Sequence, residues 1–255
     1  MNQLRTLATN TFREAVRDRV LYSILFFAAA ILALSLGLEH VTVGDQAKVT
    51  RSVAQGAIDL FGSLIAMFLG VSLVWKELDR RTVYTVLSKP IPRWSFVLGK
   101  YLGLILTLIV EIGILLAFYI VLMMFKQGFP PGVVFVSMAM LLLELSLLTA
   151  WATLFSTYSS PMTASAFTLA IFVIGHLADD IWVFGNSVDI EAVRQISRVI
   201  YWVTPNFETF NIRPYAVHEL PTPWERVWPA IVYGVFYIVA VLTVASGIFA
   251  RKDLK

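Results

Sequence analysis

The chain has 255 residues, of which 58% are hydrophobic and only 15% are charged. A soluble domain carries about 25% charged residues, so this composition predicts an integral membrane protein. The net charge of +3 is too small to indicate a nucleic-acid-binding surface, and the absence of cysteine excludes disulfides, thiolate metal sites and cysteine nucleophiles.

The first 20 residues predict an amphipathic helix. Apolar side chains recur at helical spacing from Leu4 to Val20, and basic or polar side chains occupy the opposite face. We expect this helix to lie along the cytoplasmic leaflet, with its basic face toward anionic headgroups of membrane lipid. A solvated helical extension is the alternative interpretation.

Six apolar runs follow, each long enough to cross a bilayer. We therefore predict an all-α membrane protein with a single transmembrane domain over residues 1–255. Residues 39–56, between the first two spans, are polar enough to predict an exposed outer loop. Ser160 is a candidate cap for the fifth span, with Pro161 in its first turn. The six predicted spans are residues 21–38, 57–75, 96–125, 133–155, 161–184 and 223–250.

Three small residues in the second predicted span, Gly62, Ala66 and Gly70, are four positions apart and share one helical face. Small residues at this spacing let another helix approach closely. The pattern is compatible with a contact inside the subunit or with an interface between subunits.

The segment 76–95, between the second and third spans, is rich in Lys and Arg. Charged side chains at the bilayer centre cost about 3 kcal/mol each, and an excess of Lys and Arg marks the cytoplasmic side. A short helical pattern ends there at Pro90 and Pro92, which suggests a docking surface for a soluble partner. Topology alone is the other explanation of these charges.

The segment 185–222 is the one long outer connection. Residues 189–200 are amphipathic, and several aromatic residues and prolines follow. Because aromatic rings are enriched at the headgroup level, we predict a short outer helix and an aromatic-rich cap, re-entrant or interfacial, on the outer face. With this topology most of the 20 Lys and Arg residues are cytoplasmic, as are both termini.

The sequence lacks the motifs of common enzymes. No Gly-rich phosphate loop with a Lys is present, so we expect no ATP hydrolysis by this chain. The three histidines, His40, His176 and His218, form no metalloprotease motif, and no serine-hydrolase motif is present. We therefore predict a chain that is not an enzyme and that binds no cofactor or metal itself.

Ionisable residues inside the predicted spans are the remaining candidates for function. Glu111 and Glu144 could line a pathway or relay protons, or could bond a Ser or Thr on a neighbouring helix. His176 and Asp179, with Asp180, are spaced to share one helical face, as a pH-sensitive or metal-touching cluster or as a solvated outer helix end. Asp59 is expected to face headgroup water.

The central segment contains Glu77-x-x-Arg80-Arg81-Thr82, then residues 87–93, then Gly99-Lys100. On these motifs rests a resemblance to the first cytoplasmic loop of type-2 ABC exporter permeases. It extends over nearly the whole chain, and within the family it is closest to permeases of multi-copper enzyme maturation, such as the nitrous-oxide reductase maturation permease. The other matching stretches are residues 17–21, 58–62, 155–160, 204–207 and 251–254.

This resemblance implies a half-transporter in the bacterial inner membrane. Two copies would form the membrane pathway, and two copies of a separate ABC ATPase subunit, which bind the ATP and Mg²⁺, would attach below. A coupling helix seated in the ATPase would transmit the conformational change, with Pro90 and Pro92 setting its angle to the third span. The coupling residues would be Glu77, Arg80, Arg81, Thr82, Val83, Val86, Leu87, Ser88 and Pro90.

The substrate does not follow from the resemblance. Copper or sulfur delivery, and export of lipid, glycan or peptide, are all compatible with it, although the lack of cysteine argues against a direct copper path. One alternative is mechanotransmission to a periplasmic partner, without transport. Another is a non-transporting membrane scaffold whose basic loop only sets topology.

Overall fold

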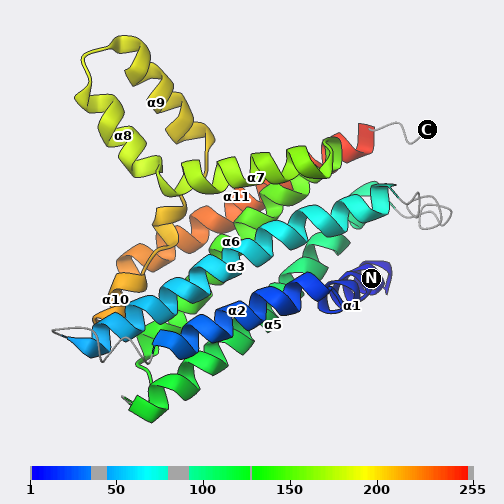
Figure 1. Cartoon of the computed structure of the whole chain (residues 1–255). Coiled ribbons are helices and arrows are strands. Elements are labelled where there is room, and N and C mark those ends of the chain that lie inside the picture. Colours follow the sequence, from blue (N-terminus) through cyan, green and yellow to red (C-terminus); the bar gives the residue numbers. More distant parts are fainter. Residues whose placement is uncertain (1, 36–44, 80–91, 127, 252–255) are drawn as a thin grey trace.

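The computed structural model describes residues 2–35, 45–79, 92–126 and 128–251, with the side chains of residues 2–3, 72–79, 93 and 126 outside the description. The described residues are helical and contain no strand, which confirms the all-α prediction (Figure 1). The helices are α1 Asn2–Val16, α2 Arg19–Ser35, α3 Gln46–Asp79, α5 Arg93–Lys126, α6 Gly132–Tyr158, α7 Pro161–His176, α8 Ala178–Ser187, α9 Glu191–Val203, the 3₁₀ helix η2 Phe207–Phe210, α10 Arg213–Val217 and α11 Trp224–Arg251.

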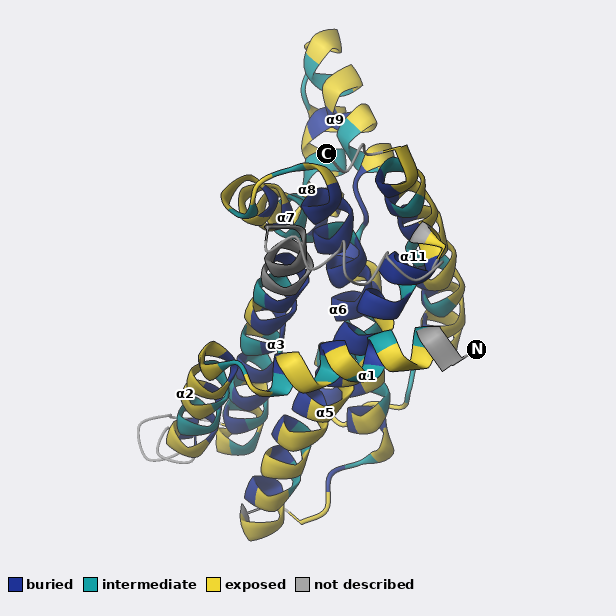
Figure 2. Cartoon of the chain, turned by 90° about the vertical axis from the view of Figure 1, so that its right-hand side faces the viewer, coloured by how far each residue is buried: buried dark blue, intermediate teal, exposed yellow. Residues whose placement is uncertain are grey.

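The long helices lie side by side in one bundle around α6, which is the most buried of them (Figures 1 and 2). Four helices, α3, α5, α6 and α11, are long and apolar enough to cross a membrane alone. The bent pairs α1–α2 and α7–α8 raise this number to 6 if each pair counts as one span. Ser160 caps α7 as predicted, because its side chain accepts a hydrogen bond from the Thr163 amide.

The predicted outer loop 39–56 is wrong over its second half, since α3 begins at Gln46. The sequence there is polar but amphipathic, with Thr50 and Ala54 fully buried one turn apart. The Thr50 hydroxyl contacts the backbone oxygen of Ser35 at the end of α2 (3.5 Å). Packing of this narrow face against the bundle therefore extends the second span by more than two turns. Residues 39–44 lie outside the described residues.

The predicted span 161–184 is divided between two helices. The helix breaks at Leu177, where α7 and α8 meet at 62°. Asp179 and Asp180 occupy the first turn of α8. Carboxylates are favoured at a helix N-terminus but are costly along a lipid-facing helix, so a new helix that leaves the bundle is the more stable arrangement.

Helices α8 and α9 form a hairpin that projects sideways from the bundle (Figure 1). The two helices touch closely at Gly185, where an added Cβ would lie 2.3 Å from the Cβ of Ser197. The Trp182 and Tyr201 rings are 4.8 Å apart. The short helix expected over 189–200 is thus present as α9, shifted by two or three residues.

The segment that follows the hairpin returns into the bundle instead of covering it. Phe207 and Phe210 are buried, which corrects the expectation that all the aromatic residues of this region lie at headgroup level. Gly175 of α7 makes the contact possible, because an added Cβ would lie 2.5 Å from the Phe207 ring. Trp202 and Trp224 remain exposed, as expected for residues at a membrane surface.

Helix α1 crosses one end of the bundle and packs on α5 (Figure 2). Gly99 and Gly103 allow this approach, since a Cβ on Gly103 would lie 2.5 Å from the Thr11 Cβ and 2.6 Å from the Ala8 carbonyl oxygen. Lys100 is buried between them, and its Nζ lies 3.7 Å from a Glu14 carboxylate oxygen. This packing confirms the amphipathic helix and contradicts the alternative of a solvated extension.

Candidate functional site

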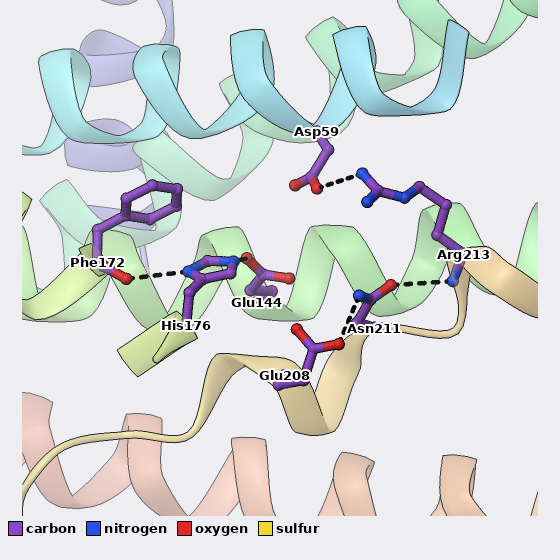
Figure 3. A network of polar contacts seen from close by, with 7 residues as sticks. All are labelled: Asp59, Glu144, Phe172, His176, Glu208, Asn211 and Arg213. Atoms are coloured by element: carbon purple, nitrogen blue, oxygen red, sulfur yellow. Dashed lines mark hydrogen bonds and ion pairs between the residues drawn. The ribbon is translucent and has the colours of Figure 1, made fainter. Parts of the chain in front are cut away.

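A polar cavity of about 120 Å³ lies between α3, α6, α7 and the returning segment η2–α10. Polar side chains from all of these elements converge on it (Figure 3). Its charged and polar lining includes Gln55, Asp59, Glu144, His176, Glu208, Asn211 and Arg213. Such a set of convergent polar groups is unusual inside an apolar bundle and is typical of a ligand or proton site.

His176 and Glu144 form the inner wall of this cavity (Figure 3). The His176 Nδ1 atom lies 2.9 Å from the Phe172 carbonyl oxygen, and Nε2 lies 3.2 Å from Glu144 Oε1. A carbonyl oxygen only accepts hydrogen bonds, so Nδ1 carries a proton. Glu144 Oε1 makes no hydrogen bond within the described residues, so its contact with His176 Nε2 is one of ion-pair distance only.

Asp59 of α3 and Arg213 of α10 form the opposite wall. Arg213 Nη1 lies 3.2 Å from Asp59 Oδ2. The backbone N–H of Arg213 donates to Asn211 Oδ1 (3.2 Å), and Asn211 Nδ2 donates to Glu208 Oε1 (2.8 Å). A series of polar contacts therefore joins α3 to the returning segment (Figure 3). Asp59 was expected to face headgroup water; its side chain is 33% exposed and is also paired with Arg213, which was not predicted.

Gln55 closes the cavity one turn before Asp59. Its side chain is 1% exposed, and Nε2 donates to the Tyr119 hydroxyl of α5 (3.3 Å). The Oε1 atom of Gln55 has no hydrogen-bond partner within the described part of the chain. A buried amide oxygen without a partner costs about 1–3 kcal/mol, so a group that donates to it from the cavity would be bound favourably.

The returning segment orients its polar side chains by burying the apolar residues between them. Phe207, Phe210 and Ile212 are buried in the bundle, and the Phe210 ring lies 6.0 Å from the Tyr233 ring of α11. Their burial leaves the intervening Glu208 and Asn211 at the cavity. The sequence pattern of large apolar residues separated by polar ones is what fixes the site locally.

A second arginine fastens the same segment to α3. Arg51 donates to the Val217 carbonyl oxygen (3.2 Å) and lies 2.8 Å from a Glu219 carboxylate oxygen. The returning segment is thus held to the outer part of α3 at two points, through Arg51 and Asp59. Helix α3 therefore both lines the cavity, through Gln55 and Asp59, and holds the returning segment, through Arg51 and Asp59.

The chain matches one known protein family over nearly its whole length. A family model described as ABC-2 family transporter protein matches residues 5–254. The chain belongs to this family. No curated protein matches it at a significant level. The ABC-2 protein is accordingly a multi-pass membrane subunit of a transporter family whose membrane chains are typically non-catalytic.

Most residues predicted to couple the ABC-2 protein to an ATPase cannot be placed. Glu77 belongs to the last turns of α3, but its side chain is not described. The others, namely Arg80, Arg81, Thr82, Val83, Val86, Leu87, Ser88 and Pro90, lie outside the described residues.

Of the predicted intramembrane candidates, only Glu144 and His176 meet at the cavity. Asp179 lies beyond the break after α7, where its Oδ1 accepts a hydrogen bond from Asn206 Nδ2 (2.7 Å). The shared face with His176 therefore does not form. Glu111 is 2% exposed in α5, does not line the cavity, and its carboxyl oxygens have no hydrogen-bond partner within the described residues.

The stripe of small residues in α3 faces α6 of the same ABC-2 protein. A Cβ on Gly70 would lie 2.5 Å from the Ala152 Cβ, and Gly62 lies against Leu145. Ala66, between them, is fully buried. The structure places this stripe at a contact inside the subunit.

Sequence reasoning missed Gln55, Glu208, Asn211 and Arg213 as parts of one site. Gln55 and the last three residues are far apart in the sequence, and only the return of η2–α10 into the bundle brings them together. One signal was available: Asp59 in an apolar span and Arg213 in an aromatic segment are opposite charges, each of which needs a partner.

Proposed function

We propose that this ABC-2 protein is the permease subunit of an ABC transporter, that it forms a homodimer, and that separate ATPase subunits drive it. The observation that carries this proposal is the family match over residues 5–254. The absence of a Gly-rich phosphate loop with a Lys in the sequence supports a partner chain as the site of ATP hydrolysis.

One end of the bundle has the features expected for docking of the ATPase. The connection 80–91 joins the ends of α3 and α5, and α1 packs beside α5 at that end (Figures 1 and 2). Both described ends of the chain also lie there, which supports two cytoplasmic termini in a bacterial inner membrane (Figure 1). The Lys and Arg residues of segment 76–95 favour the same orientation.

ATP-driven closure of the ATPase pair would act on α1, α3 and α5 together. The backbones of α1 and α5 are in close contact at Gly99 and Gly103, which favours movement of the two helices as one unit. A ligand or nucleotide state shifts such a bundle only through different binding free energies in its two conformations. The coupling residues from Glu77 to Pro90 would supply that difference.

Mechanotransmission to a periplasmic partner is a second candidate, favoured by the α8–α9 hairpin. This hairpin projects from the bundle and exposes Ile196, Val199 and Trp202. Contiguous exposed apolar side chains mark a contact with protein or lipid. The resemblance to permeases of multi-copper enzyme maturation supports a periplasmic enzyme as that partner.

The intact mass of the detergent-extracted complex tests the proposal. The ABC-2 protein is expressed with the products of its neighbouring genes, and we expect two copies of it with two copies of an ATPase. Glu77→Ala and Arg81→Ala should abolish stimulation of ATP hydrolysis while assembly persists. A lone chain without an ATPase, at any expression level, would contradict the proposal and favour a scaffold.

A further inference from the structure

We infer that the cavity between α3, α6, α7 and the η2–α10 segment is a binding site for a primary ammonium group. The inference concerns the ligand class of this cavity and does not depend on coupling to an ATPase. It rests on the balance of charges around the cavity, on unsatisfied buried acceptors in its lining and on the size of the space.

The charges of the cavity wall do not cancel. Arg213 of α10 faces Asp59 of α3, and His176 of α7 faces Glu144 of α6. Glu208 of η2 remains. Its Oε1 accepts one hydrogen bond, from the neutral Asn211 amide, and within the described residues no Lys, Arg or His lies at ion-pair distance from it. The wall thus carries three carboxyl groups (Asp59, Glu144 and Glu208) against one Arg and one His side chain, an excess that a cation would balance.

Two buried acceptors of this cavity, Gln55 Oε1 and Glu144 Oε1, have no hydrogen bond within the described residues. Gln55 lines the cavity and is 1% exposed. Its Nε2 donates to the Tyr119 hydroxyl, so the amide oxygen Oε1 does not contact that hydroxyl. The Glu208 carboxylate and the Gln55 amide oxygen line the same cavity, and both accept hydrogen bonds, so a ligand must offer hydrogen-bond donors. An ammonium group supplies three N–H donors and a positive charge, whereas an anion would meet two acceptors.

The space suits a small group. A cavity of about 120 Å³ is slightly smaller than the roughly 150 Å³ cavity that accommodates benzene, so it holds about six non-hydrogen atoms at most. Glu208 is exposed and lies where the cavity meets the surface. The ammonium group would therefore enter past Glu208 and come to rest near Gln55.

Ethylammonium chloride is the probe, and the purified full chain in detergent is the protein. We expect saturable binding with a dissociation constant of about 1 mM, near the limit for three non-hydrogen atoms, measured by NMR saturation transfer. We also expect a rise in the unfolding temperature over the same concentrations, relative to sodium chloride at equal ionic strength.

Glu208→Gln is the decisive variant, because it removes the charge at an exposed position and keeps the shape. Loss of a hydrogen bond to a charged group should raise the dissociation constant about tenfold or more. Glu225→Gln, exposed at the start of α11 and remote from the cavity lining, is the matched control and should bind like the parent chain.

Equal binding by the parent chain and Glu208→Gln would overturn the inference, as would no difference between ethylammonium and sodium chloride. A free amine and the headgroup of an aminolipid share this chemistry. In nanodiscs, phosphatidylethanolamine should weaken ethylammonium binding relative to pure phosphatidylcholine if the lipid is the natural source. Unchanged binding would identify a free amine.

Discussion

At the scale of single residues, the most consequential contact is the one between His176 and Glu144. Glu144 is 5% exposed on the central helix, and His176 lies at ion-pair distance from it across the α6–α7 contact. Removing one partner of a buried pair leaves the other without compensation, whereas removing both does not. The two residues should therefore depend on each other for stability.

His176→Leu should lower the free energy of unfolding by about 2–4 kcal/mol, because Glu144 would remain buried without its partner. The double variant His176→Leu with Glu144→Leu should lose less than the sum of the two single variants. Unfolding in mixed micelles, followed by circular dichroism, gives the comparison. Strict additivity of the single losses would show that the two side chains do not interact.

The sequence predicted Glu144 and His176 as separate candidates but could not pair them. A buried carboxyl group can be recognised from its place in an apolar run, since its cost there is high. Its partner depends on how α6 and α7 face each other, and that rotation is set by packing across many residues. For the same reason Asp59 was expected to face headgroup water, although Arg213 is its partner.

At the scale of elements, the glycines between α1 and α5 determine how the bundle end is built. Gly103 lies so close to α1 that an added Cβ would meet the Ala8 carbonyl oxygen at 2.6 Å. Backbone cannot give way as a flexible side chain does. By contrast, nothing lies within 4 Å of a Cβ added at Gly113, which is on the same helix.

Gly103→Ala should therefore displace α1 and destabilise the protein by about 1–3 kcal/mol. Gly113→Ala should be neutral or stabilising by up to about 1 kcal/mol, since Ala is the better helix former. Thermal unfolding of the two variants in the same detergent makes a matched comparison. If Gly103→Ala proves as stable as Gly113→Ala, the tight α1–α5 contact does not exist.

Element boundaries were predictable where the apolar runs were long and failed where polar residues were involved. The α5 and α6 spans were found within a few residues. The start of α3 was missed because its first turns bury only a narrow face at Thr50 and Ala54. The end of α7 was missed because the preference of Asp179 and Asp180 for a helix start outweighed the apolar run around them.

At the scale of the whole molecule, the orientation in the membrane is the prediction that most of the function depends on. The chain contains no cysteine, so single introduced cysteines report on sidedness without background. Helices α1 and α10 lie toward opposite ends of the bundle (Figure 1). Asn10 on α1 and Leu220, which follows α10 in the chain, are both exposed.

Asn10→Cys should react with a membrane-impermeant maleimide only in inverted vesicles, and Leu220→Cys only in intact cells stripped of their outer membrane. This pattern follows from the concentration of Lys and Arg around segment 76–95. The measurement is the extent of labelling by gel shift. Reaction of both cysteines from the same side would rule out the six-span topology.

Helix α3 has a mechanical consequence that its length implies. Its 34 residues form a single rod of about 50 Å, which is bound to the returning segment through Arg51 and Asp59 and ends at Asp79. A rod of this kind acts as a lever. A tilt imposed at one end reappears at the other without any relay of side chains between them. A ligand bound in the cavity would then resist or favour that tilt. Binding near one face of the membrane would therefore change the position of the α3 end at the opposite face.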